Sequence, residues 1–320
     1  MRCLCLLALL AFTTADACAR ETDNYLVWGV ELADAGAQIN GYLADQIQTA
    51  LRTQPRDASC EEATFAIAKR LQTGLRYETR IERWAIDNLS AEQIYPRGHV
   101  SSNATIHRDP FYFYMNFAEP APLLQVGGFY FGVDKLSHFG SVGRVYLKKY
   151  LQQRRAGASR ESALAQAIGE GINQERTFLG LLGSGVYSYA DLEANYQGLL
   201  FFQRLCLSGE LPYLTHTPDT GWRLTSAPNI GEYVSGNWDE SYNTPYYLRH
   251  HWPGVRRVLR EKYCAKAHEP SVVARMEHYR LNSPASFSML YLAGLRAENS
   301  RLTPFDPQQD FTNACAGTGP

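Results

Sequence analysis

The chain has 320 residues, of which 45% are hydrophobic and 20% charged, and its formal net charge is −1 at pH 7. Because acidic and basic residues are nearly balanced, the sequence gives no electrostatic reason to expect nucleic acid or an anionic membrane as a partner. A chain of this length can bury a substantial core, as one large domain or two small ones.

Residues 1–19 have the pattern of a secretory signal peptide. A basic second residue precedes an apolar run that ends at Phe12, and small residues follow as far as Ala19. The run is too short to span a bilayer, so we expect cleavage after Ala19 and export of the mature chain. Cleavage after Ala17 and acylation of Cys18, as in a lipoprotein, are the alternatives.

The cysteines left after this cleavage agree with export, and they are Cys60, Cys206, Cys264 and Cys315. An even number without a C-x-x-C motif favours two disulfides over a zinc site. Four cysteines allow three pairings, between which the sequence does not decide. The Pro/Gly-rich tail would fray if it were not tied down, which favours Cys264–Cys315 and leaves Cys60–Cys206.

The first part of the mature chain has amphipathic helix patterns. Apolar residues recur every four positions between 24 and 51 and predict one helix there: Ile39, Leu43, Ile47 and Leu51. Ser59 and Glu62 have the spacing of a capping box, which predicts the start of a second helix. Residues 80–95 favour one or two further short helices.

From Tyr95 to Phe131 the chain is rich in aromatic residues and proline. We expect a long ordered loop here, with at most a short strand. Loops of this length in compact domains are usually functional or packed by their own side chains. Arg97, His99 and His107 lie in this loop, and for both histidines we expect an exposed or structural role rather than a ligand role.

The later part of the chain is predominantly helical in pattern. Helices are predicted over 134–153, 160–182, 188–206, 254–265, 270–280 and 285–297. The stretch 209–247 is rich in Pro, Gly and Asn and is predicted to be loop, and the tail beyond Pro304 to be loosely held. No window after the signal peptide reaches the roughly 18 uncharged apolar residues of a membrane span.

These patterns predict a mainly α fold with a bundle-like helical core and long ordered loops rich in aromatic residues and proline. The expected organisation is a signal peptide (1–19), N-terminal helices with the aromatic loop (20–131), a helical core (132–208), and a C-terminal region of loop and short helices (209–320). We expect the last region to form one compact unit with the core.

Two apolar-rich helices of the core carry polar residues four positions apart. Asp134 and His138 lie on the first, and Asp191 and Asn195 on the second. Positions four apart share one face of a helix. Polar groups are costly to bury unless they satisfy one another or serve a function. The sequence therefore predicts a polar cluster inside a helical protein.

The order of these motifs resembles that of the VanZ-like and YfiM-like envelope proteins. The shared features are D-K-x-x-H-F at 134–139, a later Glu, and S-x-x-D-L-x-A-N-x-x-G at 188–198, within a match that spans about residues 132–202. The matching positions are Asp134, Lys135, His138, Glu175, Asp191, Asn195 and Gly198. The resemblance implies a bacterial envelope protein, in the periplasm or associated with the outer membrane.

The chain also departs from this family. VanZ-like members cross the membrane several times, whereas the matching region here carries too many charges to lie in lipid. The family's E-x-x-Q pattern is not reproduced, since Gln174 precedes Glu175. Glu170 is a rival for the family's Glu, although its distance from Asp191 fits less well.

The predicted cluster offers one imidazole and three carboxylates. Asp134, His138, Glu175 and Asp191 have the donor atoms of a site for a hard or borderline divalent metal ion. Alternatively, His138 is a general base oriented by Asp134 or Asp191. Lys135 or Arg176 would then offset the negative charge or grip a phosphate.

Two function hypotheses follow. In the first, the protein is a hydrolase that acts on an envelope lipid or glycan by acid/base or metal-assisted chemistry, with His138, Asp134, Glu175, Asp191, Asn195 and Lys135 as catalytic residues. In the second, it is a non-catalytic periplasmic binding or scaffold protein. Asp134 is then a helix N-cap, Ser188 with Asp191 forms a capping box, and His138 is a satisfied core histidine.

In the non-catalytic hypothesis, the ligand or partner is held by the aromatic loops at 108–131 and 232–247. The second loop contains Trp238-Asp239-Glu240-Ser241-Tyr242-Asn243, in which aromatic and acidic side chains would hold a sugar or peptide. Both hypotheses are compatible with peripheral contact with a membrane.

Overall fold

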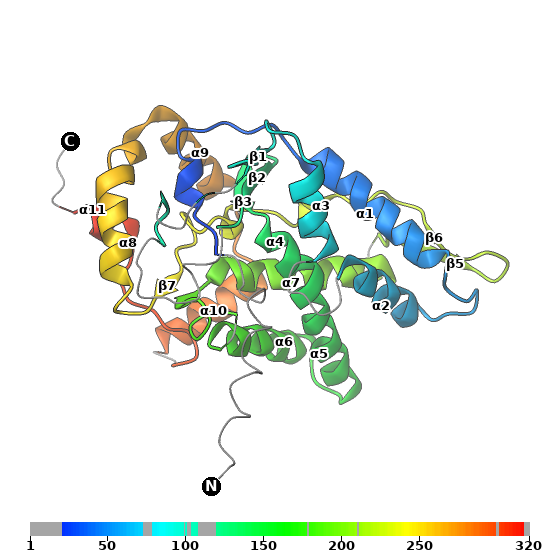
Figure 1. The fold of residues 1–320 in the computed structure, drawn as a ribbon. Helices are drawn as coiled ribbons and strands as arrows, with labels where there is room; N and C mark the ends of the chain where they lie inside the picture. The colour runs from blue at the N-terminus through cyan, green and yellow to red at the C-terminus, as the bar shows by residue number, and fades with distance from the viewer. Residues whose placement is uncertain are drawn as a thin grey trace, which may run out of the picture.

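The computed structural model describes residues 21–72, 79–98, 100, 104–107, 120–177, 179–209, 211–298 and 301–316. The fold is mainly α-helical, as the sequence predicted, with a few short strands between the helices (Figure 1). The expected signal peptide lies outside the described residues. None of the helices in the described ranges is long and apolar enough to cross a membrane.

The first predicted helix is wrong at its start. A 3₁₀ helix, η1 (Asn24–Val27), is separated by turns and extended chain from α1 (Gly36–Leu51). The reason is a tertiary contact, because Asp34 bridges to Gln125 of a strand and its carboxylate accepts the amides of Gly36 and Gly127, both at 2.6 Å. α1 itself buries the predicted stripe of Ile39, Leu43 and Ile47.

The second helix begins at the predicted capping box. In α2 (Cys60–Leu71), Ser59 Oγ accepts the Glu62 amide at 3.2 Å, and the Glu62 carboxylate accepts the Ser59 amide at 2.8 Å. This reciprocal pair satisfies two of the free amides at the helix start. α3 (Arg80–Asn88) follows and covers only the first part of the range predicted to be helical.

The aromatic and Pro-rich segment contains more sheet than the predicted short strand. β1 (Ile94–Tyr95), β2 (Leu123–Val126) and β3 (Phe129–Gly132) form an antiparallel sheet in this order. Gly127 and Gly128 connect β2 to β3 with positive φ angles of 60° and 83°, which suits a two-residue hairpin turn. Both strands of this hairpin are buried throughout.

The helical core begins directly after β3. α4 (Asp134–Ser137), a π-helical turn, η3 (His138–Val142), and α5 (Gly143–Arg155) run on as one irregular helix, and α6 (Arg160–Glu175) follows. α6 ends before the predicted position 182, because the chain after Glu175 forms glycine-containing turns. α7 (Tyr189–Cys206) crosses the middle of the molecule and packs against α2, α4, α5, α6 and α10 (Phe287–Ala297) (Figure 1).

The region predicted to be loop, 209–247, holds short elements. β5 (Leu214–Thr217) and β6 (Gly221–Leu224) form a hairpin, and β7 (Tyr246–Tyr247) pairs with β4 (Val186–Tyr187). The 3₁₀ turns are η4 (Ile230–Glu232) and η5 (Gly236–Trp238). Beyond them the helical elements are α8 (Trp252–Val258), η6 (Leu259–Tyr263), η7 (Lys266–His268), α9 (Pro270–Asn282), α10 (Phe287–Ala297) and α11 (Phe311–Cys315).

The two disulfides have the favoured pairing. Cys60–Cys206 joins the start of α2 to the end of α7, and Cys264–Cys315 joins the end of η6 to α11. The prediction of a loosely held tail is wrong up to residue 316. The Pro304 carbonyl accepts the Tyr189 hydroxyl at 2.6 Å, and Gln309 makes two hydrogen bonds to the backbone of Tyr247.

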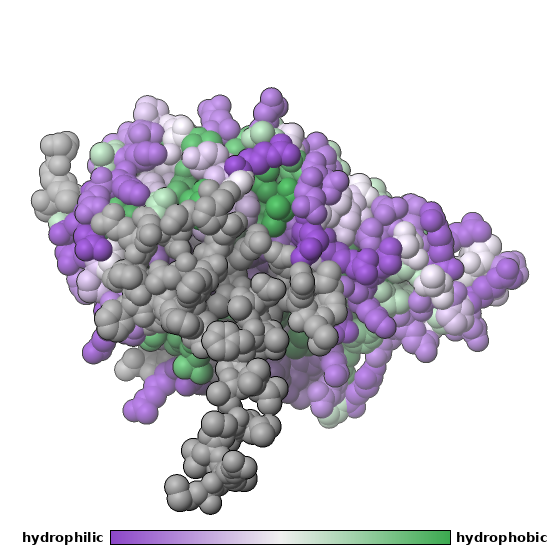
Figure 2. Space-filling model, viewed as in Figure 1, coloured by the Kyte–Doolittle hydropathy of each residue, from purple (hydrophilic) through white to green (hydrophobic). Residues whose placement is uncertain are grey.

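The main hydrophobic core lies between α7 and the helices around it. Its largest side chains are aromatic, and Phe139 packs on Phe201 and Trp238 with ring centroids 5.0 and 5.9 Å apart. Hydrophilic residues cover the end of the molecule that carries α1, α2 and the β5–β6 hairpin (Figure 2). The polar cluster lies in this otherwise apolar interior.

Candidate functional site: a buried ion cluster centred on Lys135

The polar faces of the two motif helices meet inside the core. The His138 ring contacts both polar residues of α7, since its Nδ1 lies 3.0 Å from Asn195 Oδ1 and its Nε2 lies 3.2 Å from Asp191 Oδ2. His138 lies in the π-helical turn that follows α4, and Asp191 and Asn195 lie one turn apart on α7. The structure thus brings together the two pairs that the sequence singled out.

Lys135 occupies the centre of the cluster. Its Nζ lies 2.7 Å from Asp134 Oδ2, 2.7 Å from Asp191 Oδ1 and 2.8 Å from Glu240 Oε1, and its side chain is 0% exposed. Burial by itself lowers the pKa of a lysine, but the three carboxylates raise the pKa of Lys135 above its ordinary value. The ammonium therefore stays charged. It donates hydrogen bonds to Asp134 and Glu240 and forms an ion pair with Asp191.

Glu240 is a member of the cluster that sequence reasoning did not assign. Its Oε1 accepts from Ser188 Oγ at 2.7 Å as well as from Lys135, and its amide donates to Asn24 Oδ1 at 3.1 Å. Burial raises the pKa of Glu240 to about 7, although the charge of Lys135 opposes this shift. Its only sequence signal was its place in the polar-aromatic loop 232–247.

That loop is not an open ligand surface at its centre. Trp238, Asp239 and Glu240 are at most 2% exposed, and Asp239 accepts the Tyr279 hydroxyl at 2.9 Å. The loop instead supplies one carboxylate to the cluster and an indole ring to the core. Of the other loop in the non-catalytic hypothesis, 108–131, residues 108–119 lie outside the described ranges.

Asp134 does not cap its helix. The N-cap position is Val133, and Asp134 Oδ1 accepts from Thr22 Oγ1 at 2.6 Å while Oδ2 faces Lys135. Asp134 therefore links the N-terminal segment to the ion cluster. The structural interpretation of this residue as an N-cap is wrong, because its side-chain oxygens are both engaged away from the helix amides.

Ser188 forms only half of the expected capping box. Its hydroxyl accepts the Asp191 amide at 3.1 Å, as an N-cap does, but the Ser188 amide donates to Glu175 Oε2 at 3.0 Å and not to Asp191. Glu175, at the end of α6, takes the place that a capping-box Glu would have. This leaves the Asp191 carboxylate free to face Lys135 and His138.

Glu175 is the glutamate that approaches the cluster, whereas its rival lies at the surface. Glu170 pairs with Lys149 at 2.8 Å, and both side chains are partly exposed. Glu175 is 1% exposed, and its Oε1 has no hydrogen-bond partner in the described part of the chain. Burial and the nearby charge of Asp191 raise the pKa of Glu175 well above its ordinary value, which favours the protonated form of this carboxyl.

Glu21 is a further acid that the sequence patterns did not reveal. It precedes Thr22, which bridges to Ala121. Burial and the charges of Glu240 and Asp191 raise the pKa of Glu21 well above its ordinary value. For Asp191 the balance is the opposite, because His138 and Lys135 outweigh burial and lower its pKa. Neighbouring acids with pKa values pushed apart are typical of acid/base sites.

Three of the four predicted metal ligands lie together. Asp134, His138 and Asp191 each offer one ligand atom, and these atoms lie within 4.8 Å of one another. Glu175 is not part of this group. The ammonium of Lys135 contacts both carboxylates, so a divalent ion would have to compete with a positive charge that is already bound there. The donor set therefore fits a divalent ion poorly.

The histidines of the aromatic loop do not join the cluster as ligands where the structure describes them. His107 is buried, and its Nε2 lies 3.0 Å from the Thr22 carbonyl. Burial lowers the pKa of His107 to about 4, which agrees with the predicted structural role. His99 lies outside the described residues, and Arg97 is not among the groups that contact the cluster.

Fold and site together define a mainly α-helical protein with a lysine-centred ion cluster buried in its core. No protein-family model, curated protein or solved structure matches the chain.

Proposed function

We propose that the chain is an exported bacterial envelope enzyme of the VanZ-like and YfiM-like kind, in which His138 transfers a proton during hydrolysis of an envelope lipid or glycan. The observation that supports this most is the position of the His138–Asp191 pair. These residues and Asp134 are 6–8% exposed, whereas Lys135, Glu175 and Glu240 are at most 2% exposed. The imidazole thus lies at the edge of the cluster that is nearest to solvent.

Each neighbour of His138 has a role in this proposal. Asn195 holds Nδ1, and ionised Asp191 orients Nε2 and balances the charge of an imidazolium. The contact between Nε2 and Asp191 is 3.2 Å, the longest ion-pair contact of the cluster, so a substrate or water can replace it at lower cost than the others.

Lys135 positions the acids and does not itself transfer a proton. Its contacts with Asp134 and Asp191 keep both carboxylates in place. The raised pKa of Glu175 favours its protonated form, in which the Oε1 that has no partner in the described part of the chain would donate a hydrogen bond that an ionised Glu cannot donate.

Export and the envelope location rest on other features. The N-terminal pattern is that of a signal peptide, and two disulfides join distant segments, which is typical of chains that fold in an oxidising compartment. The order of the D-K-x-x-H-F and S-x-x-D motifs supports a bacterial envelope protein.

The test is a product assay on the mature protein. Purified protein is incubated with isolated cell-wall sacculi and, separately, with vesicles of total envelope lipid, and soluble products are identified by mass spectrometry. Loss of an acid/base group typically costs 10²–10⁴-fold in rate, so His138→Gln and Asp191→Asn should lower product formation by about 100-fold or more. The control, His268→Gln, changes an exposed histidine of η7 and should keep full activity.

Two other outcomes separate the alternatives. Activity that is lost with EDTA and restored by a divalent ion would replace the acid/base mechanism by the metal-assisted one. If no substrate gives product and His138→Gln changes only the melting temperature, the cluster is structural and the non-catalytic scaffold hypothesis holds.

A further inference from the structure

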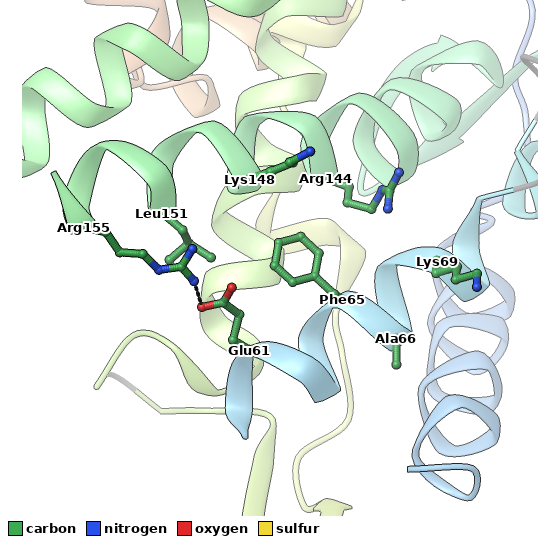
Figure 3. A pocket seen from close by; sticks show the side chains of 8 residues that line it. All are labelled: Glu61, Phe65, Ala66, Lys69, Arg144, Lys148, Leu151 and Arg155. Atoms are coloured by element: carbon green, nitrogen blue, oxygen red, sulfur yellow. Dashed lines mark hydrogen bonds and ion pairs between the residues drawn. The ribbon is translucent and has the colours of Figure 1, made fainter. Parts of the chain in front are cut away.

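A hollow lies on the outer side of the helical core, between α2 and α5. Its volume is about 480 Å³, and none of its lining residues belongs to the ion cluster. The side chains that line it come from both helices (Figure 3): Glu61, Phe65, Ala66, Lys69, Arg144, Lys148, Leu151 and Arg155.

The charges in this hollow are not balanced. Arg155 pairs with Glu61, the one acid in the lining. Lys69, Arg144 and Lys148 make no ion pair with any residue that the structure describes. By contrast, Lys149, the neighbour of Lys148 on α5, is paired with Glu170. Three like charges around one hollow repel one another, and an anion bound between them would remove this repulsion.

Arg144 gives an independent indication of a ligand. Its Nε is buried and has no hydrogen-bond partner within the described ranges. Buried donors are nearly always paired, because an unpaired one loses its hydrogen bonds to water without compensation. Figure 3 shows the Arg144 guanidinium directed toward α2 at the same end of the hollow as Lys69. An acceptor oxygen in the hollow would satisfy Nε.

The floor of the hollow is partly apolar. Phe65 of α2 and Leu151 of α5 are both half-buried, and the Phe65 ring lies between Glu61 and Arg144 in Figure 3. A ligand that fills this space thus contacts cations at one end. Beside these cations it contacts the Phe65 ring and the Leu151 side chain.

We infer that this hollow binds a phosphate group carried by a molecule with a short apolar part. A phosphate has the acceptor oxygens and the double charge that an arginine fork and two lysine ammonium groups can share. Phe65 and Leu151 would pack against the apolar part. This site is independent of the function proposed for His138, and its test does not involve the ion cluster.

The test measures phosphate binding at physiological ionic strength by calorimetry and by NMR of the arginine Nε–H groups. The probes are inorganic phosphate and dihexanoyl phosphatidic acid below its micelle concentration. The double variant Arg144→Gln/Lys148→Gln removes two lining charges. The matched control, Lys149→Gln/Arg154→Gln, removes two charges from the same helix outside the hollow, so the net charge of the two variants is equal.

Binding should weaken by about tenfold or more in the first variant and by less than threefold in the control, because the charge-assisted hydrogen bonds to the ligand are lost only in the first. The Arg144 Nε–H signal should shift on binding. Tighter binding of the lipid than of inorganic phosphate would support a phosphate ester with an apolar part, and equal binding of the two would refute the role of the apolar part and identify the free anion as the ligand. No binding of either probe, or equal loss in both variants, would overturn the inference.

Discussion

Gly143 and Gly198 bring α5 and α7 together backbone to backbone. A Cβ atom on Gly143 would lie 2.8 Å from the Cα of Gly198, and a Cβ on Gly198 would collide with the carbonyl oxygen of Phe139. Phe139 follows His138 in the π-helical turn, and Asn195 precedes Gly198 by one turn of α7. The absence of a side chain at Gly198 therefore sets the distance at which His138 reaches Asn195 and Asp191.

Gly198→Ala should destabilise the fold by about 2 kcal/mol or more, because the added methyl group meets backbone atoms that cannot turn aside. The control is Gly169→Ala in α6, where a Cβ meets nothing within 4 Å. There, replacement of a helical glycine should stabilise by roughly 0.5–1 kcal/mol. Urea denaturation of both variants gives the two values, and a neutral Gly198→Ala would contradict the close approach of the helices.

Lys135→Met should lower the free energy of unfolding by about 3–5 kcal/mol at pH 7.5, because it leaves carboxylates buried without their cation. Lys149→Met, which breaks the partly exposed pair with Glu170, should cost less than about 1 kcal/mol. The loss in Lys135→Met should be smaller at pH 5, where Glu240 is protonated. Denaturation at both pH values measures this, and a Lys135→Met chain as stable as wild type would refute the central role of Lys135.

The contribution of Glu240 to stability should fall as the pH rises from about 4.5 to 7, whereas the lowered pKa of His107 acts in the opposite direction. The unfolded chain releases the Glu240 proton near 4.5, whereas the folded chain holds it until about 7, so deprotonation in this window favours the unfolded state. Glu175 and Glu21, with raised pKa values, act in the same direction. The lowered pKa of Asp191 makes stability depend on pH only below this window.

Glu240→Gln isolates one part of this effect. The amide keeps an acceptor for Lys135 and Ser188 and no longer titrates, so the fall in stability between pH 5 and 7.5 should shrink by up to about 3 kcal/mol. The check is the free energy of unfolding in urea at the two pH values for both proteins. An unchanged pH dependence in Glu240→Gln would show that this carboxyl does not hold its proton.

Several helices could be predicted from the sequence because their signals are local. The stripe of α1, the capping box of Ser59 and Glu62 and the N-cap of Ser188 each depend on residues within four positions of one another. The start of α1 could not be predicted in this way, since Asp34 leaves the helical pattern to pair with Gln125, far along the chain.

Net charge was also a poor guide to local charge. The balance of −1 over the whole chain hides Lys69, Arg144 and Lys148, which come from segments about 75 residues apart and share one hollow only after α2 and α5 have packed. Attraction of an anion depends on the charges within about one Debye length, roughly 8 Å at physiological salt. It does not depend on the net charge of the whole chain.

By itself, the sequence determined that the chain is mainly helical and that Asp134 with His138, and Asp191 with Asn195, share helix faces, because a helix repeats every 3.6 residues whatever its surroundings. Only the tertiary structure decided which charges surround Lys135. Glu240 approaches it from a loop without periodicity, and Glu21, the first described residue, lies near enough for the charges of Glu240 and Asp191 to raise its pKa. Burial then decided which carboxyls have raised pKa values, since the free-energy cost of a buried charge depends on packing that no local pattern records.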